Sequence, residues 1–303
     1  MAGKFKWLIL AMMLVLSGCR FVDNAKPLVL STTGMIHDAV CAIAGDRVSA
    51  KVLMGPGVDP HLYRMRAGDI ALFQKSTIIF YNGLNLEAQL GRALSGLSTK
   101  KTVRAISNGI PRDRLIMAED HEDNPDPHIW FDIDLWREAV QTVTQTLSET
   151  MPEHADTFRK NAATYDQLLR ELDTWVAHQI ATIPAENRVL ITAHDAFSYL
   201  EKRYGITVVG LQGMNTLSET SPADITRVTS IILNRSIPTI YVESSVPVRQ
   251  IEAVQAAVRA KGKDVAIGPP LFTDAMGAPG TPEGTYVGMI TTTIRHIVEG
   301  LTP

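Results

Sequence analysis

One uninterrupted stretch in the middle of the chain limits the folds that it can adopt. Between Pro152 and Ile183 there is no glycine and no further proline, and apolar residues recur at steps of three and four. That spacing puts them on one stripe of an α-helix, and Pro152 and Pro184 mark its two ends. About thirty residues rising about 1.5 Å each make a helix of roughly 45 Å, long enough to cross a whole domain. Two shorter helices with a break near Asn161 are the alternative.

Strands and helices alternate on both sides of this helix. Short apolar runs take turns with segments of helical period, which is typical of parallel sheets covered by helices. In the first half the predicted strands cover residues 28–30, 48–54, 77–81 and 102–107, and the helices cover 35–44, 67–75 and 86–97. In the second half the strands cover 188–191, 207–211, 239–242 and 264–267, and the helices cover 196–204, 222–234 and 248–261. The chain is therefore predicted to be an α/β protein with two lobes of mostly parallel sheet, joined by one long rigid α-helix.

The start of the chain has the pattern of a lipoprotein signal. Lys4 and Lys6 precede an apolar run, residues 7–16, that is too short to span a bilayer, and Leu16-Ser17-Gly18-Cys19 follows. Cleavage before Cys19 and acylation of its thiol would anchor the protein to a membrane; an ordinary signal peptide with an incidental cysteine is the alternative. The predicted segments are a signal peptide at 1–18, a lipidated tether at 19–26, an N-terminal lobe at 27–151, the linking helix at 152–183 and a C-terminal lobe at 184–303.

Charge and cysteine content restrict the classes of function. Removing residues 1–18 takes away two lysines and no acids, so the formal net charge of −3 becomes −3 − 2 = −5. No basic patch in the sequence points to nucleic acid. Once Cys19 carries lipid, Cys41 is the remaining cysteine, and no internal disulfide can form. Cys41 follows His37 by four residues, so a metal pair is conceivable, but the apolar neighbours Ile36 and Val40 favour a small buried thiol.

Four motifs each place one metal-ligand side chain after a predicted strand. They are His61 in G-V-D-P-H, His128 in D-P-H-I-W, His194 in T-A-H-D and Asp274 in L-F-T-D-A-M-G. The carboxyl ends of parallel strands are where α/β sheets bind ligands, and three imidazoles with one carboxylate complete a four-coordinate set for a divalent transition metal. Two donors come from each half, so the metal is expected between the lobes. An exposed loop histidine and a helix or turn cap are the alternatives for His194 and Asp274.

Several other residues are candidates for supporting this site. Asp59 and Asp126 each precede a proline and a predicted ligand, and can accept a hydrogen bond that orients the histidine ring. Glu243 ends a predicted strand, where it can stabilise His194 or meet a cationic ligand. His121 lies in an acidic loop that is either a weak capture site or, as the charge run favours, a solvated loop. Three further candidates are Tyr63, Asn82 and Glu87.

Longer motifs carry a family resemblance. They are G-V-D-P-H-L-Y (57–63), Y-N-G-L-N-L-E (81–87), D-P-H-I-W-F-D (126–132), T-A-H-D-A-F-S-Y (192–199), V-V-G-L-Q-G (208–213), V-E-S-S-V-P (242–247) and L-F-T-D-A-M-G (271–277). Together with the lipoprotein signal, they resemble the metal-specific solute-binding lipoproteins of ABC importers, of the cluster A-I type. The resemblance covers nearly all of residues 27–301. The usual hydrolase, nucleotide-binding and redox motifs are absent from the sequence.

The resemblance implies a fold, a cargo and a partner. His61, His128, His194 and Asp274 would bind manganese or zinc, with ferrous iron less favoured, and two lobes joined by a long helix would move little on loading. The protein would be a monomer, held outside the cytoplasm by its lipid, and would deliver metal to an ABC permease.

Two departures from the family pattern bear on the choice of metal. A short acidic stretch around His121 replaces the histidine-rich loop of many zinc members, and His194 replaces the glutamate of many manganese members. The chain resembles the subgroup in which three histidines and an aspartate serve manganese, zinc or both. The rival functions are a zinc hydrolase, in which Asp274 would have to leave a coordination position open, and a lipid-anchored surface adhesin.

Overall fold

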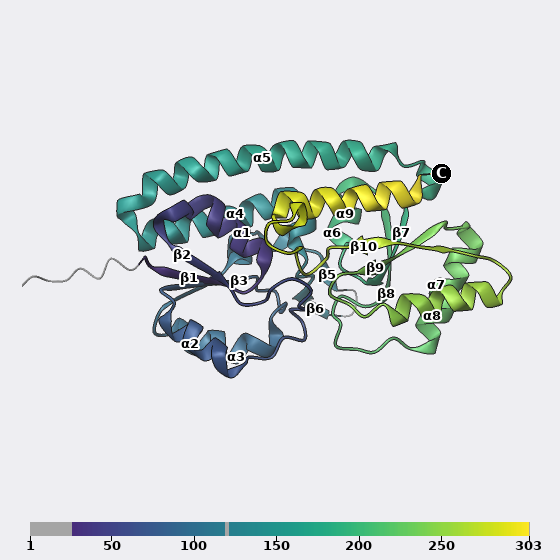
Figure 1. The fold of residues 1–303 in the computed structure, drawn as a ribbon, viewed down its shortest axis with the longest axis horizontal. Coiled ribbons are helices and arrows are strands. Elements are labelled where there is room, and N and C mark those ends of the chain that lie inside the picture. The colour runs from purple at the N-terminus through teal and green to yellow at the C-terminus, as the bar shows by residue number, and fades with distance from the viewer. Residues whose placement is uncertain (1–25, 119–120, 303) are drawn as a thin grey trace, which may run out of the picture.

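The computed structural model describes residues 26–118 and 121–302, so the predicted signal peptide and Cys19 lie outside the described residues. Two α/β lobes lie side by side, and α5 (Ala155–Thr182) runs along both of them (Figure 1). The predicted fold of two mostly parallel lobes and one long helix is confirmed. The alternative of two shorter helices is wrong, because α5 continues through Asn161, whose side-chain amide donates a hydrogen bond to the carbonyl of Ile43.

The N-terminal lobe is built on a four-stranded parallel sheet in the order β2-β1-β3-β4. Its strands are β1 (Leu28–Ser31), β2 (Ser49–Val52), β3 (Ile78–Tyr81) and β4 (Thr102–Ala105). Helices α1 (Gly34–Ala44) and α4 (Ile133–Thr150) cover the face toward α5, and α2 (Ala67–Lys75) and α3 (Gly91–Ser98) cover the opposite face. Side chains alternate between the two faces, since Ile78 and Phe80 join the core under α1 while Ile79 joins the core over α2.

The C-terminal lobe contains two parallel strand pairs, with β7 and β9 side by side. The pairs are β7 (Val189–His194) with β8 (Thr207–Gln212), and β9 (Thr239–Glu243) with β10 (Ala266–Leu271). The helices are α6 (Ser198–Tyr204), α7 (Pro222–Arg235), α8 (Arg249–Ala260) and α9 (Tyr286–Leu301). Every residue of β7 is buried, which suits a strand covered on both faces.

One apolar core continues from lobe to lobe beneath α5. It includes Phe158 and Leu169 of α5, and Phe131 before α4 packs against Phe197 before α6 with ring centroids 4.3 Å apart. Asp38 of α1 reinforces this junction, because it accepts hydrogen bonds from helices α5 and α9, through the hydroxyl of Tyr165 and the backbone N–H of Tyr286. A large rotation of one lobe against the other would break this shared core, so the fold favours small local movements.

Three local features differ from the sequence prediction. The helix predicted at 86–97 starts later, because a turn precedes it. Leu84 and Asn85 take left-handed backbone angles in this turn (φ 53° and 63°), and the carboxylate of Glu87 closes the turn by accepting the backbone N–H of Asn82. Cys41 is exposed rather than buried, since it falls outside the buried stripe of α1. The acidic loop contributes to an antiparallel pair, β5 (Met117–Ala118) and β6 (His121–Pro125).

In the part of the chain that the structure describes, no helix has the length and apolar character needed to cross a bilayer.

Candidate metal centre

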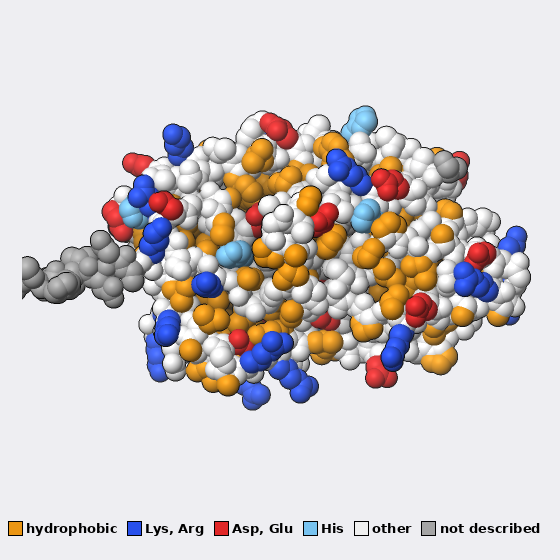
Figure 2. Space-filling model, viewed as in Figure 1, with side chains coloured by type: hydrophobic (Ala, Val, Ile, Leu, Met, Phe, Trp, Pro, Cys, Tyr) orange, Lys and Arg blue, Asp and Glu red, His pale blue; other side chains and the backbone are white. Residues whose placement is uncertain are grey.

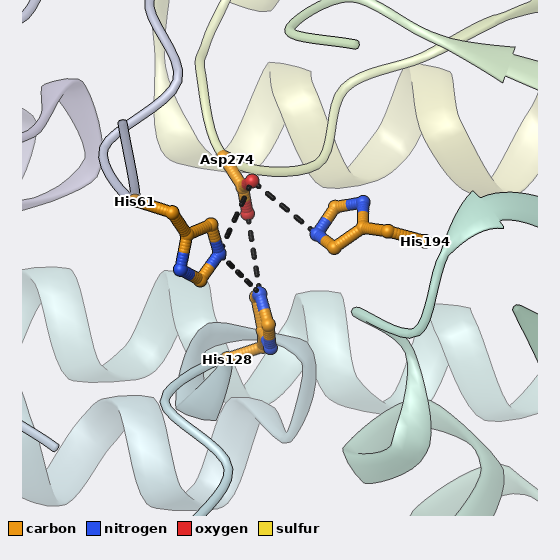
Figure 3. Close-up of side chains that lie close together, drawn as sticks. All are labelled: His61, His128, His194 and Asp274. Carbon is orange, nitrogen blue, oxygen red and sulfur yellow. Dashed lines mark hydrogen bonds and ion pairs between the residues drawn. The ribbon is translucent and has the colours of Figure 1, made fainter. Parts of the chain in front are cut away.

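The four predicted ligands converge between the lobes (Figure 3). His61 lies in the loop after β2, His128 in the loop before α4, His194 at the end of β7 and Asp274 in the loop after β10. Each offers one donor atom, and these atoms all lie within 4.8 Å of one another. All four residues are buried. The structure therefore brings together four side chains that are up to 213 positions (274 − 61) apart in the sequence.

The spacing of the donors suits a small divalent ion. The Nε2 atom of His61 lies 3.3 Å from Nε2 of His128 and 3.6 Å from Oδ2 of Asp274. Oδ1 of Asp274 lies 3.4 Å from Nε2 of His128, and its Oδ2 lies 3.3 Å from Nε2 of His194. A tetrahedral zinc ion with bonds of about 2.0–2.2 Å holds its donors about 3.3–3.6 Å apart. Four of the inter-donor distances fall in this range, with the distances to Asp274 shared between its two carboxylate oxygens.

The inward-facing atoms have few other partners. Both carboxylate oxygens of Asp274 and Nε2 of His194 are buried and accept or donate no hydrogen bond among the described residues. Buried polar atoms in native proteins are nearly always paired with protein, water or an ion. The donor set consequently fits a metal by its chemistry as well as by its spacing.

Two of the histidine rings are held from behind by carboxylates. Oδ1 of Asp126 lies 2.7 Å from Nδ1 of His128 and accepts the backbone N–H of the same residue. Oε2 of Glu243 lies 2.6 Å from Nδ1 of His194, and its Oε1 accepts that residue's backbone N–H at 2.8 Å. A carboxylate at Nδ1 keeps the proton there and leaves Nε2 free for a metal. Asp126 and Glu243 are thus placed where the sequence analysis expected supporting acids.

His61 is held differently. Asp59 accepts the backbone N–H of His61 at 2.8 Å, and its other oxygen accepts the hydroxyl of Thr216 at 2.5 Å. The expectation that Asp59 orients the ring is therefore wrong: this carboxylate fixes the loop of His61 and ties it to the loop after β8 in the other lobe. Thr216 was missed in the sequence, where a threonine in a polar loop carries no signal.

The loops of His128 and Asp274 are joined to each other. The indole N–H of Trp130 donates to the carbonyl of Thr273 at 3.0 Å, and the hydroxyl of Tyr286 donates to the carbonyl of Trp130 at 2.7 Å. The side-chain amide of Asn82 donates to the carbonyl of Pro127 at 2.9 Å. These bonds join the loops of two of the four donors, His128 and Asp274, while His61 lies on a separate loop.

The buried cluster lowers the pKa of one of its histidines and raises the pKa of the other two. Burial lowers the pKa of His61 to about 4. Burial also disfavours charge on His128, but the carboxylates of Asp126 and Asp274 outweigh it and raise the pKa of His128 to about 9. Glu243 and Asp274 likewise outweigh burial and raise the pKa of His194 well above its usual value. The same histidines outweigh the burial of Asp274 and hold its pKa well below the usual range. Without metal, protons therefore occupy part of the site.

A cavity of about 220 Å³ leads to the His61 side of the site. His61 is one of its walls, together with Leu84, Asn85, Pro127 and Leu217. A larger cavity of about 580 Å³ lies between α4 and α5, away from the donors. Of these two cavities, only the smaller one is lined by a predicted ligand.

Other candidates from the sequence stand apart from this centre. The side chain of His121 lies outside the described side chains. Sγ of Cys41 lies 3.5 Å from Nε2 of His37, on α1, and the group of metal-capable side chains found among the described residues does not include them. Tyr63 donates its hydroxyl to Asp69 rather than to the site.

We expect the substitution Thr216→Val to release metal faster. It removes the hydroxyl that ties Asp59 and the His61 loop to the other lobe, and groups that position ligands typically contribute about 10-fold to 100-fold in metal affinity. Stopped-flow mixing with a chelator measures the dissociation rate. Thr216→Ser keeps the hydroxyl and should dissociate like the unchanged protein, whereas an unchanged rate for Thr216→Val would mean that the contact does not hold His61.

Comparisons with known proteins give a consistent set of relatives. Residues 29–300 match the family described as zinc-uptake complex component A, periplasmic (ZnuA). The chain is 46% identical over 278 residues to the zinc-binding protein TroA of Treponema pallidum, covering 92% of this chain and 90% of that protein. It is 42% identical over 273 residues to the manganese-binding lipoprotein MntA of Bacillus subtilis, covering 90% and 89%. The solved structure of the periplasmic zinc-binding protein TroA from T. pallidum has a TM-score of 0.90 at 45% identity, covering 92% of this chain and 100% of that chain.

Proposed function

Since the chain belongs to the ZnuA family of periplasmic zinc-uptake components, the solute-binding proteins of metal ABC importers, we propose that its cargo is a divalent transition metal held by His61, His128, His194 and Asp274. The observation that carries this assignment is the set of buried donor atoms that face one another at the spacing of a four-coordinate ion. The protein captures the ion outside the cytoplasm and delivers it to an ABC permease.

Zinc and manganese are the two cargoes that the site and the relatives support. Relatives of similar identity are a zinc-binding protein and a manganese-binding lipoprotein. Three nitrogen donors favour zinc. The carboxylate of Asp274 turns one oxygen toward His128 and the other toward His194, so it can bind through both oxygens and give the higher coordination number that manganese prefers.

The placement of the protein follows from the signal sequence and the family. The lipoprotein pattern at residues 16–19 supports cleavage before Cys19 and a lipid anchor on its thiol. The relatives include a periplasmic protein and a lipoprotein. We assign the protein to the outer side of the cytoplasmic membrane, as a lipid-anchored monomer beside its permease.

The rival functions have less support. A hydrolytic zinc site keeps one coordination position for water, and here Asp274 lies within reach of all three histidines. The family is one of transport proteins, and the adhesin alternative rests on the lipid anchor alone. We therefore place the protein among metal receptors rather than enzymes.

Metal content tests the proposed function. Protein purified from its own host under metal-limited growth should hold close to one equivalent of zinc or manganese, measured by elemental analysis. A double variant, His128→Ala with His194→Ala, should hold none. Equal metal content in both proteins would place the bound ion somewhere else and refute the assignment.

We expect the purified protein to bind zinc more tightly than manganese. Divalent affinities rise from manganese toward zinc at nitrogen-rich sites, so zinc should displace manganese even if the cell imports manganese through this protein. Competition followed by the metal-induced shift in melting temperature checks this order. Tighter binding of manganese would show that the site opens to a higher coordination number, with both oxygens of Asp274 on the metal.

A further inference from the structure

The N-terminal lobe concentrates positive charge on one side. Between residues 62 and 112 the sequence has eight Lys or Arg and two acids, a formal charge of 8 − 2 = +6 in a chain whose total is −3. Both acids, Asp69 and Glu87, are buried, with 9% and 4% of their surface exposed. The acids therefore lie inside the lobe while the basic side chains face outward.

The basic residues belong to α2 and α3 or to the segments beside them, and these two helices cover the face of the lobe away from α5 (Figure 1). We call this surface the basic face; it consists of Arg64, Arg66, Lys75, Arg92, Lys100 and Lys101. Figure 2 shows Lys and Arg side chains gathered along this lower left part of the molecule. Two of the six have structural contacts as well, because Arg66 lies over the ring of Tyr63 and Lys101 donates to the last carbonyls of α2.

Large apolar side chains are exposed among these charges. Leu62, Met65 and Ile70 are 48%, 41% and 48% exposed, and they alternate in the sequence with Arg64 and Arg66. Basic and apolar groups side by side on a surface are typical of proteins that rest on a membrane, where the charges meet anionic headgroups and the apolar groups enter the headgroup boundary.

The tether brings this lobe close to the membrane. Seven residues, Cys19 to Ala25, precede the first described residue, Lys26. Fully extended, they span roughly 25 Å. A lipid on Cys19 would hold the N-terminal lobe, rather than the C-terminal one, within that distance of the bilayer. Charge complementarity then selects which side of the lobe faces the lipid.

We propose that the basic face rests on anionic lipid headgroups of the cytoplasmic membrane. This inference rests on the extracytoplasmic placement in the proposed function. Arg64, Met65 and Arg66 lie three to five residues after His61, and His61 itself forms part of the wall of the cavity between the lobes. Contact through the basic face thus keeps the His61 side of the metal site near the membrane plane, where the permease lies.

Binding to lipid vesicles tests the proposal. The mature chain with Cys19→Ser, which cannot carry lipid, should cosediment with vesicles of phosphatidylglycerol and phosphatidylcholine but not with phosphatidylcholine alone, and added salt should weaken the binding. The fourfold variant Arg64→Gln, Lys75→Gln, Arg92→Gln, Lys100→Gln should bind at least tenfold more weakly, because each basic residue near an anionic surface contributes about fivefold. None of these four side chains contacts the metal donors.

A matched control removes four positive charges from the other lobe. The variant Lys202→Gln, Arg235→Gln, Lys261→Gln, Lys263→Gln has the same net charge and should bind vesicles nearly as well as the unchanged chain. An equal loss of vesicle binding in both variants, or no loss of binding in the first variant, would refute the proposal that the basic face binds lipid. If the basic face binds an acidic loop of the permease instead of lipid, the chain will not cosediment with vesicles. That result would also refute the proposal. A chain that binds vesicles but no metal would refute the proposed function and leave the basic face standing.

Discussion

Replacing His61 by alanine is expected to lower metal affinity by a hundredfold or more while the metal-free protein still folds. A four-ligand zinc site supplies about 10–16 kcal/mol, which is about 2.5–4 kcal/mol for each donor. The ring of His61 lies against the other donors, and its backbone N–H donates to Asp59, a bond that alanine at this position keeps. Its loss therefore leaves no carboxylate without an imidazole behind it, unlike the loss of the His194 side chain, which would take away the imidazole beside Oε2 of Glu243.

Isothermal titration measures the affinity, and melting curves recorded with chelator measure the fold. His178→Ala, which removes an exposed histidine of α5, is the matched control and should change neither quantity. If His61→Ala failed to fold without metal, the histidine would be structural. If the variant bound metal as tightly as the unchanged protein, His61 would not be a ligand.

Metal affinity is expected to depend on pH well above the usual range of histidine. The pKa of His128 is raised to about 9 and that of His194 is raised well above its usual value, while the pKa of His61 is lowered to about 4. Between about pH 5 and 8 the metal-free site therefore holds protons on His128 and His194, and a metal must displace both. Affinity should rise by about a hundredfold for each pH unit in that window, since each displaced proton contributes tenfold.

Three unperturbed histidines would behave differently. With a pKa of about 6.5, they would be neutral above about pH 7.5, and affinity would fall only as the pH dropped through about 6. Calorimetry in buffers of different ionisation enthalpy counts the protons released at pH 7. A count of two supports the coupled cluster of His128, His194 and Asp274, whereas a count near zero would mean that the carboxylates do not hold protons in the empty site.

The four candidate ligands could be chosen from the sequence because each stands in a short local motif. His61 and His128 both follow an aspartate and a proline, and His194 follows an apolar strand. In a parallel sheet the carboxyl ends of the strands lie at the same edge. Residues that follow different strands can therefore be expected to meet there even when the full fold is not known. Membership of the family then agrees with the fold that these patterns predict. That the four residues bind the metal remains a prediction for the substitutions to decide.

The contacts that hold the ligands depend on distances that no local pattern encodes. Asp59 was expected to act on the ring of His61, two residues away, but it contacts the backbone and Thr216, 157 positions along the chain. Trp130 joins the loop of His128 to that of Asp274 through the carbonyl of Thr273. The sequence does contain the excess of basic residues between 62 and 112, but it does not reveal that Asp69 and Glu87 are buried or that the basic residues flank the same two helices.

The wide separation of the four donors along the chain also affects how long the protein survives. A metal bound to His61, His128, His194 and Asp274 cross-links segments from both lobes, and an unfolded chain cannot present this arrangement. Binding to the folded form alone stabilises it by about 4 kcal/mol when free metal is a thousandfold above its dissociation constant. The loaded protein should therefore resist proteases longer than the empty one, so that metal supply itself adjusts how much of the protein persists.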